Sequence, residues 1–222
     1  AAAETEEQMH ARHVAFLTAY QNAAYAARYA GVVERVRKAE PVGRRQFSEA
    51  VARSLFKLMA YKDEYEVARL YTDGAFLAQL ADTFDGDRLR LRFHLAPPIL
   101  GRKDPVTGRP RKTTFGPWVL PLFRILARLK GLRGTKLDIF GYTKERRTER
   151  QLVVDYIALI DRLLSKLSGE NYDIAVRIAE LLLKIRGFGH VKERNLQAVK
   201  TEEVALLAQF ERPRQFVVEA AE

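Results

Sequence analysis

The stretch TKERRTERQLVVDYIALIDRLLSKL, residues 143–167, has the clearest helical periodicity in the chain. Its apolar residues recur every three or four positions, which predicts an amphipathic helix with one inward face. Thr143 can cap the start of this helix, and Ser168-Gly169 ends it. The predicted inward row is Leu152, Tyr156, Leu159, Leu163 and Leu167.

The same periodicity extends towards the C-terminus. Asn171 can cap a following helix, and a last helix is predicted over about Lys192–Phe210. The inward residues expected in the helix after Asn171 are Ile174, Ile178, Leu181 and Ile185.

Helical patterns also fill the N-terminal third of the chain. One long helix is predicted from about Thr5 to Lys38, and Ser48 is a plausible N-cap for a helix through Met59. Asp63 followed by Glu66 has the form of a capping box. An alanine row in the long helix would let a neighbouring helix approach closely: Ala15, Ala19, Ala23, Ala27 and Ala30.

The middle of the chain breaks this pattern. Residues 88–95 alternate strictly between basic or polar and apolar side chains, which predicts a half-buried strand. Residues 101–114 have the composition of an exposed loop, and a helix follows from Pro117 or Trp118. Its apolar residues Trp118, Leu122, Ile125 and Leu129 fall on one face, and we interpret Trp118 as a core residue.

The fold expected from these patterns is mainly α, a helical domain with a small β element near residues 88–95. We expect one domain over residues 1–222, with three sub-ranges: helical 1–84, basic strand, loop and helix 85–142, and helical 143–222.

Composition excludes several classes of protein. The chain has 222 residues, 47% of them hydrophobic and 30% charged, which is typical of a globular protein. The absence of cysteine excludes disulfides, thiolate-bound iron–sulfur clusters and cysteine-ligated zinc in this chain. No apolar run approaches membrane-spanning length, and the first residues lack a hydrophobic signal core, so a cytoplasmic protein with no membrane partner is expected.

The net charge of +10 comes from one segment. Residues 101–150 hold 14 Lys and Arg against 4 Asp and Glu, whereas the rest of the chain is balanced. This segment could be a nucleic-acid patch, a docking surface for an acidic protein, or a solvated surface. Its arginine content favours docking. The aromatic side chains that a nucleic-acid patch could use for stacking are Phe115, Trp118, Phe140 and Tyr142.

Catalytic and metal-binding motifs are not found in the sequence, and we predict no catalytic residue and no metal site. His10 and His13 lie one turn apart and could share a metal, but we interpret them as a solvated pair. His94 is interpreted as a packed or hydrogen-bonded residue of the strand. Asp63, Glu64 and Glu66 stand at a helix N-terminus, where capping and the helix dipole explain them better than acid–base catalysis.

The stretch IRGFGHVKER, residues 185–194, is unusual because two glycines stand among four cationic or titratable residues. It could form an anion site at the start of the following helix. It could also be a tight turn whose charges meet acidic residues elsewhere, which is the interpretation we favour.

Five longer stretches resemble the C-terminal domain of the long-chain indolepyruvate ferredoxin oxidoreductase family, the fused thiamine-diphosphate-dependent 2-oxoacid oxidoreductases. They cover most of the chain in the family's order, and residues 181–184 depart from the expected pattern, which has a proline there. The stretches are LTAYQNAAYAARY (17–29), LFKLMAYKDEYEVARLY (55–71), RFHLAPPIL (92–100), FGPWVLPLFRILARLKGLRGTKLDIFGYTKERRTER (115–150) and IRGFGHVKERN (185–195).

The resemblance implies a parent enzyme that decarboxylates an aryl 2-oxoacid such as indolepyruvate, reduces ferredoxin and makes an acyl-CoA. Thiamine diphosphate, magnesium and iron–sulfur clusters are then expected in the parent protein and none in this chain. The chain would be a noncatalytic domain, excised or separately encoded, that packs on the catalytic domains of the same polypeptide or complex.

Ligand contacts follow from the same hypothesis. CoA phosphates or an acidic ferredoxin would meet a group of basic residues. These are Arg124, Arg128, Arg146, Arg147, Arg186, His190 and Lys192. The alternative is a stand-alone, basic nucleic-acid-binding helical module, which we consider less favoured; a homodimer is compatible with either.

Overall fold

The computed structural model describes residues 4–84, 91–95, 113–187 and 190–212, apart from the side chains of Leu77 and His190. Over these ranges the chain is mainly helical, and two short strands form an antiparallel sheet, so the predicted fold class is confirmed. The chain divides into two compact units. Unit 1 consists of residues 1–61 and 148–222, and unit 2 of residues 62–147.

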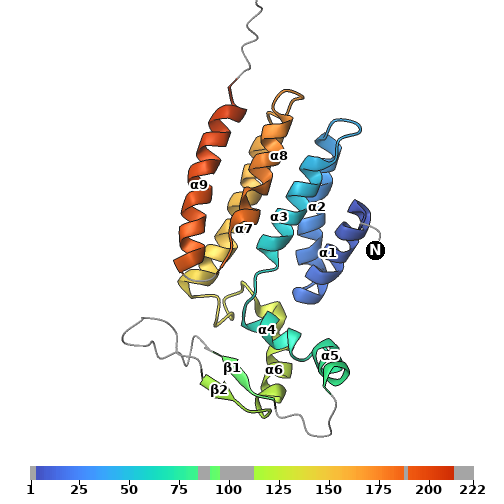
Figure 1. Cartoon of the computed structure of the whole chain (residues 1–222), viewed down its shortest axis with the longest axis vertical. Helices are drawn as coiled ribbons and strands as arrows, with labels where there is room; N and C mark the ends of the chain where they lie inside the picture. Colours follow the sequence, from blue (N-terminus) through green and yellow to red (C-terminus); the bar gives the residue numbers. More distant parts are fainter. Residues whose placement is uncertain (1–3, 85–90, 96–112, 188–189, 213–222) are drawn as a thin grey trace, which may run out of the picture. The chain divides into compact units, whose positions relative to one another are not determined.

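Unit 1 is a bundle of helices that run side by side (Figure 1). Helix α3 packs on both α2 and α8, and α9 packs on α8. Large side chains fill the interior, among them Leu17, Tyr29, Phe47, Leu55 and Ile160, each fully buried. The elements are α1 (Glu6–Tyr20), α2 (Ala23–Ala39), α3 (Gln46–Met59), most of α7 (Lys144–Leu164), α8 (Tyr172–Glu180), the 3-10 helix η2 (Leu181–Lys184) and α9 (His190–Phe210).

The predicted long helix from Thr5 to Lys38 is two helices, because Asn22 interrupts it. Asn22 has an extended backbone, and its side chain accepts a hydrogen bond of 2.8 Å from the backbone N–H of Tyr25. A short polar side chain that satisfies a free N–H in this way starts a new helix instead of continuing the old one. The start near Thr5 is confirmed, with a capping box between Thr5 and Gln8.

The alanine row is not the inward face of these helices. Ala15, Ala19, Ala23 and Ala27 are exposed. The larger residues decide the orientation, since they bury more apolar surface per position. The inward residues are Met9, His13, Leu17 and Tyr20 on α1, and Ala26, Tyr29, Val32, Val33 and Val36 on α2.

Helix α3 begins two residues before the predicted cap, Ser48. The free N–H groups of its first turn bind Glu40, whose Oε1 accepts from the backbone nitrogens of Phe47 and Ser48 at 2.8 and 3.2 Å. A carboxylate from the preceding loop therefore replaces the predicted local cap. The predicted end at Met59 is confirmed.

The predicted helices near the C-terminus are found with small differences. The Thr143 hydroxyl accepts from the backbone N–H of Arg146 at 3.3 Å, which confirms this cap of α7. Asn171 stands before α8 but its side chain does not cap it; it binds the backbone of Ser168 and Lys166 instead. Helix α9 ends at Phe210 as predicted.

Unit 2 has a small core around an antiparallel hairpin. Strands β1 (Phe93–Leu95) and β2 (Thr113–Phe115) pair with Phe93 opposite Phe115. The core cluster consists of the buried Ala68, Phe93, Val119 and Phe123, with partly buried neighbours around them. The helices are α4 (Glu64–Leu70), α5 (Ala75–Thr83), α6 (Val119–Arg128) and the 3-10 helix η1 (Leu129–Leu132).

His13 is a buried residue of the bundle, so its interpretation as a solvated residue is wrong. Its Nδ1 lies 2.8 Å from the Tyr29 hydroxyl, and its ring stacks on Phe56 with centroids 3.8 Å apart. Burial, with a smaller contribution from the Arg12 charge, lowers the pKa of His13 from 6.5 to about 4. The folded state therefore holds this imidazole neutral.

Acidification should destabilise unit 1 through His13. The unfolded chain takes up a proton on His13 near pH 6.5, whereas the folded chain does so near pH 4. The contribution of neutral His13 to the free energy of unfolding is thus fully present above pH 6.5. This contribution falls as the pH drops towards 4, by about 3 kcal/mol in total. Urea unfolding at pH 7, 6, 5 and 4 measures this slope, and His13→Gln should make it shallower by about 1 kcal/mol per pH unit. An unchanged slope in the variant would show that the pKa of His13 is the same in the folded and the unfolded chain.

Candidate functional site

Helix α6 of unit 2 carries a row of exposed apolar side chains. Trp118, Leu122, Ile125 and Leu129 are 66%, 55%, 56% and 43% exposed. We call these four residues the α6 row. They share one face, as the sequence predicts, but the interpretation of Trp118 as a core residue is wrong.

The α6 row is exposed because another face of the helix meets the core. Val119 and Phe123 are buried, and Leu126 packs partly against the same cluster. At about 100° per residue, this buried face is turned by roughly a quarter of the circumference from the α6 row. A helix that is apolar on more than one face is the signal that could have revealed the row in the sequence.

The exposed apolar surface of unit 2 includes the segment that follows η1. Leu137, Ile139 and Tyr142 are each more than half exposed. Exposed apolar side chains scattered singly are ordinary, but several within one short region mark an interaction site. Together with the α6 row, these residues are apolar side chains that unit 2 does not bury in its own small core.

A buried ion pair holds the start of this segment. Arg133 donates to both carboxylate oxygens of Asp63 at 2.6 and 2.8 Å, and both side chains are almost fully buried. Asp63 also accepts from the backbone N–H of Glu66 at 2.9 Å, which confirms it as the cap of α4. The predicted capping box is incomplete, because the Glu66 side chain binds Arg69 instead.

A second buried carboxylate, Asp138, folds the rest of the segment. Its oxygens accept from the backbone nitrogens of Gly134 and Gly141 at 2.8 and 3.0 Å, and from the Tyr65 hydroxyl at 3.2 Å. Gly134 has a φ of +77°, which a residue with a side chain rarely adopts. The loop is therefore fixed by buried polar bonds and by Phe140, which packs against Tyr65, while Leu137 and Ile139 face outward.

Several basic side chains of unit 2 are exposed. Arg124, Arg128 and Arg147 are exposed and form no ion pair with a carboxylate in the described part of unit 2. Arg146 differs, since it is partly buried and pairs with Glu64 at 3.3 Å. Of the four candidate anion-binding residues in unit 2, three therefore keep their charge available to a partner.

The remaining candidate anion-binding residues lie in unit 1, around the glycine turn. Lys192 pairs with Glu149, the Arg186 side chain is exposed, and the His190 side chain lies outside the described residues. Gly187 has a φ of +87°, and a Cβ there would come 2.7 Å from Cγ1 of Val191. This turn requires glycine for steric reasons, which supports the interpretation as a tight turn.

Lys57 adds a cation to this turn that sequence reasoning missed, because Lys57 precedes the turn by more than 120 residues. Its Nζ donates to the carbonyl oxygens of Leu182, Leu183 and Ile185 at 3.1, 2.7 and 2.7 Å. Burial, followed by the charges of Arg186 and Lys192, lowers the pKa of Lys57. With all three donors used, Lys57 binds the end of η2 and has none left for a ligand.

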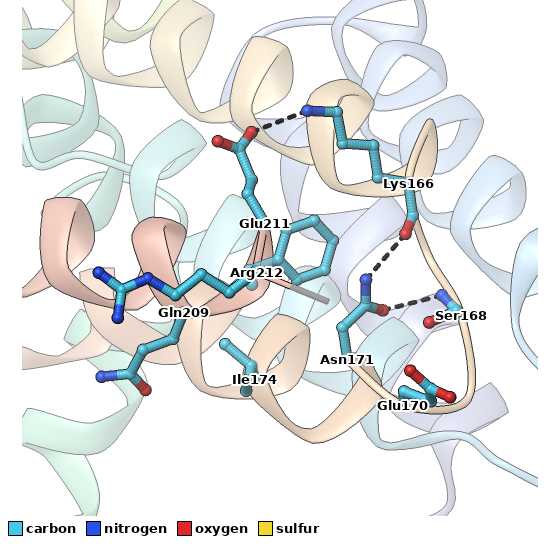
Figure 2. A pocket seen from close by; sticks show the side chains of 9 residues that line it. Lys166, Ser168, Glu170, Asn171, Ile174, Gln209, Glu211 and Arg212 are labelled. Carbon is cyan, nitrogen blue, oxygen red and sulfur yellow. Dashed lines mark hydrogen bonds and ion pairs between the residues drawn. The ribbon is translucent and has the colours of Figure 1, made fainter. Parts of the chain in front are cut away.

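A shallow pocket lies between the end of α9 and the start of α8 (Figure 2). It measures about 230 Å³, which is small for a ligand site. Its polar groups bind one another: Lys166 pairs with Glu211 at 3.0 Å, and Asn171 binds the backbone of Lys166 and Ser168 at 2.8 Å. The pocket therefore offers few groups to a ligand.

Neither a metal site nor a membrane span is found in the ranges that the structure describes. No three His, Asp or Glu side chains there come together as metal ligands. None of the described helices is long and apolar enough to cross a membrane.

Comparison with known proteins identifies the family. A family model described as a family of unknown function (DUF6537) matches residues 7–205. The chain belongs to this family. No curated protein and no solved structure matches it. The matched range includes α6 and the Asp63–Arg133 pair, so the family domain contains the candidate site.

Asp63→Asn should destabilise unit 2 by about 3 kcal/mol, because it leaves the buried Arg133 guanidinium without a counter-charge. Asparagine can still cap α4, so the loss would report the ion pair and not the cap. Hydrogen exchange of the α4 amides, followed by mass spectrometry, measures the change.

The matched control is Glu49→Gln, which removes the exposed Arg53–Glu49 pair of α3. Its cost should stay below about 1 kcal/mol, because exposed ion pairs contribute little. Equal protection of α4 in Asp63→Asn and in the unsubstituted chain would contradict the role given to this pair.

Proposed function

We propose that this chain is a noncatalytic helical domain of an indolepyruvate, or aryl 2-oxoacid, ferredoxin oxidoreductase, and that it packs on the catalytic domains through the α6 row. The resemblance of five long stretches to that enzyme family supports the parent enzyme. The observation that carries the packing role is the exposure of four apolar side chains on one face of α6.

The α6 row supports protein packing over other roles because of its chemistry. Apolar side chains gain free energy when another apolar surface removes them from water. Trp118 adds a large aromatic side chain, a residue type that is enriched at interface centres. The exposed Arg124 and Arg128 beside the row could also border a CoA or ferredoxin site of the parent.

The cofactors of the proposed parent are assigned to its other domains. The residues of this chain do not fit an iron–sulfur cluster, because the sequence has no cysteine. The described residues likewise bring no three carboxylate or imidazole groups together for magnesium. The proposed contribution of this chain is therefore to assembly and not to the chemical steps.

A stand-alone nucleic-acid-binding module remains the second candidate, favoured by the exposed arginines of unit 2. It predicts binding that weakens steeply with salt, because cations released from phosphates drive it. Filter binding of duplex and single strands at two salt concentrations tests it. The α6 row favours the packing domain over the nucleic-acid module, since phosphate backbones would leave these apolar side chains exposed.

The decisive experiment tags the chromosomal gene in the source organism and purifies its product under native conditions. We expect a particle far larger than 25.4 kDa that reduces a viologen dye when indolepyruvate and CoA are both supplied. A particle without 2-oxoacid-dependent dye reduction would contradict the proposed function.

The double variant Leu122→Asp/Ile125→Asp tests the packing role in the same purification. Two carboxylates in the row should lower the yield of active particle about tenfold or more, because each would be buried unpaired at the interface. The control is Val154→Asp on α7, since Val154 is also exposed, at 48%. An equal yield from both variants would contradict packing through the α6 row.

A further inference from the structure

The spacing of the α6 row indicates the shape of its partner. The four residues are separated by four, three and four positions, which is the a/d spacing of a coiled-coil seam. Such a seam packs knobs-into-holes against another helix. At about 1.5 Å per residue, the row extends about 17 Å, so a partner helix of about three turns would cover it.

The row is bounded differently on its two sides. On one side lie Val119 and Phe123, which are buried in the core of unit 2. On the other side, turned by about 100° from the row, lie Arg124 and Arg128. A helix laid along the row therefore meets two arginines on one flank only.

The positive charge of unit 2 favours a partner helix that carries acidic side chains. Residues 62–147 hold 18 Lys and Arg against 10 Asp and Glu, whereas the rest of the chain holds 20 against 18. Arg124 and Arg128 form no ion pair with a described carboxylate, and Lys136 and Arg147 are further exposed cations of unit 2. Acidic side chains on the partner helix would be attracted to this flank and basic ones repelled.

A second copy of this chain does not satisfy these conditions. A two-fold symmetric contact places the same surface of both copies face to face. Pairing through the α6 row would then bring two arginines from each copy to one seam. In addition, the row has four residues, whereas a stable interface between free proteins uses about 20–30 residues a side.

We propose that the α6 row binds an acidic amphipathic α-helix from outside this chain, with apolar residues on its a and d positions and carboxylates facing Arg124 and Arg128. This inference rests on the proposed function, in which the partner helix belongs to the same polypeptide or assembly. Tethering supplies the effective concentration that lets so small a row bind.

The chain contains its own probe for this contact, because Trp118 is its single tryptophan and lies in the row. The experiment titrates the 222-residue chain with a designed three-turn to four-turn helical peptide that has leucine at a and d, glutamate at the flanks and no aromatic residue. The matched peptide carries lysine in place of glutamate. Trp118 emission should shift to shorter wavelength as the acidic peptide covers it.

The acidic peptide should bind about tenfold more tightly than the basic one, in line with two exposed charge pairs. Arg124→Glu/Arg128→Glu should reverse this preference, and Leu122→Asp/Ile125→Asp should abolish the emission shift with either peptide. Circular dichroism checks that both variants keep the helical fold, which is expected because all four positions are exposed.

Three results would overturn the inference: equal affinity for both peptides, no emission shift with the acidic peptide at millimolar concentration, or a shift that grows with the concentration of the chain alone. The last would identify a second copy as the occupant. Failure here is separable from failure of the proposed function, which is read from 2-oxoacid-dependent dye reduction by the native particle.

Discussion

The buried ion pair between Asp63 and Arg133 is the interaction on which unit 2 depends most. The Asp63 carboxylate caps α4 and binds the guanidinium of a residue seventy positions later in the chain. Breaking one side of such a pair is costly, because the remaining charge stays buried without a partner. The pair therefore fixes where the chain runs after α6.

This constraint explains how unit 2 keeps apolar side chains at its surface. Within the described ranges, its core cluster has only four buried residues, which is too few to order a long segment by apolar burial alone. Asp63 and Asp138 order the segment after α6 through polar bonds, so Leu137 and Ile139 need not turn inward. The α6 row and this segment are then left for a contact with another protein surface, which is the basis of the proposed packing role.

The sequence predicts those helices and strands well whose determinants, apolar period and capping residue, lie within the element itself or next to it. The apolar period of residues 143–167 gives α7, and Asp63 gives the start of α4. The alternation predicts a strand over residues 88–95, but the strand spans only Phe93–Leu95; Leu91 and Arg92 lie before it, and residues 88–90 lie outside the described residues. Asn22 could have been recognised as a cap, since asparagine competes with the helix backbone in this way. The cap of α3 could not, because it comes from Glu40, which precedes the helix in the loop and has no fixed spacing rule.

The candidate site was harder to predict because it depends on which of two apolar faces is buried. Trp118 and Val119 are adjacent in sequence, and their periodicity is equivalent, yet Val119 is buried and Trp118 exposed. Only the packing against Phe93 and Ala68 decides between them. The charges around the glycine turn posed the same difficulty, since the partner of Lys192 is Glu149, forty-three positions away.

Hydroxyl-radical footprinting of the native particle would show whether another protein surface covers the α6 row. Oxidation of Trp118 and Leu122 is compared between the native particle and the isolated 222-residue chain, with the exposed Val154 and Val204 of unit 1 as internal references. We expect strong protection of Trp118 and Leu122 in the particle, relative to those references. Equal oxidation of Trp118 in both samples would show that nothing covers the α6 row, so that it is not a contact surface.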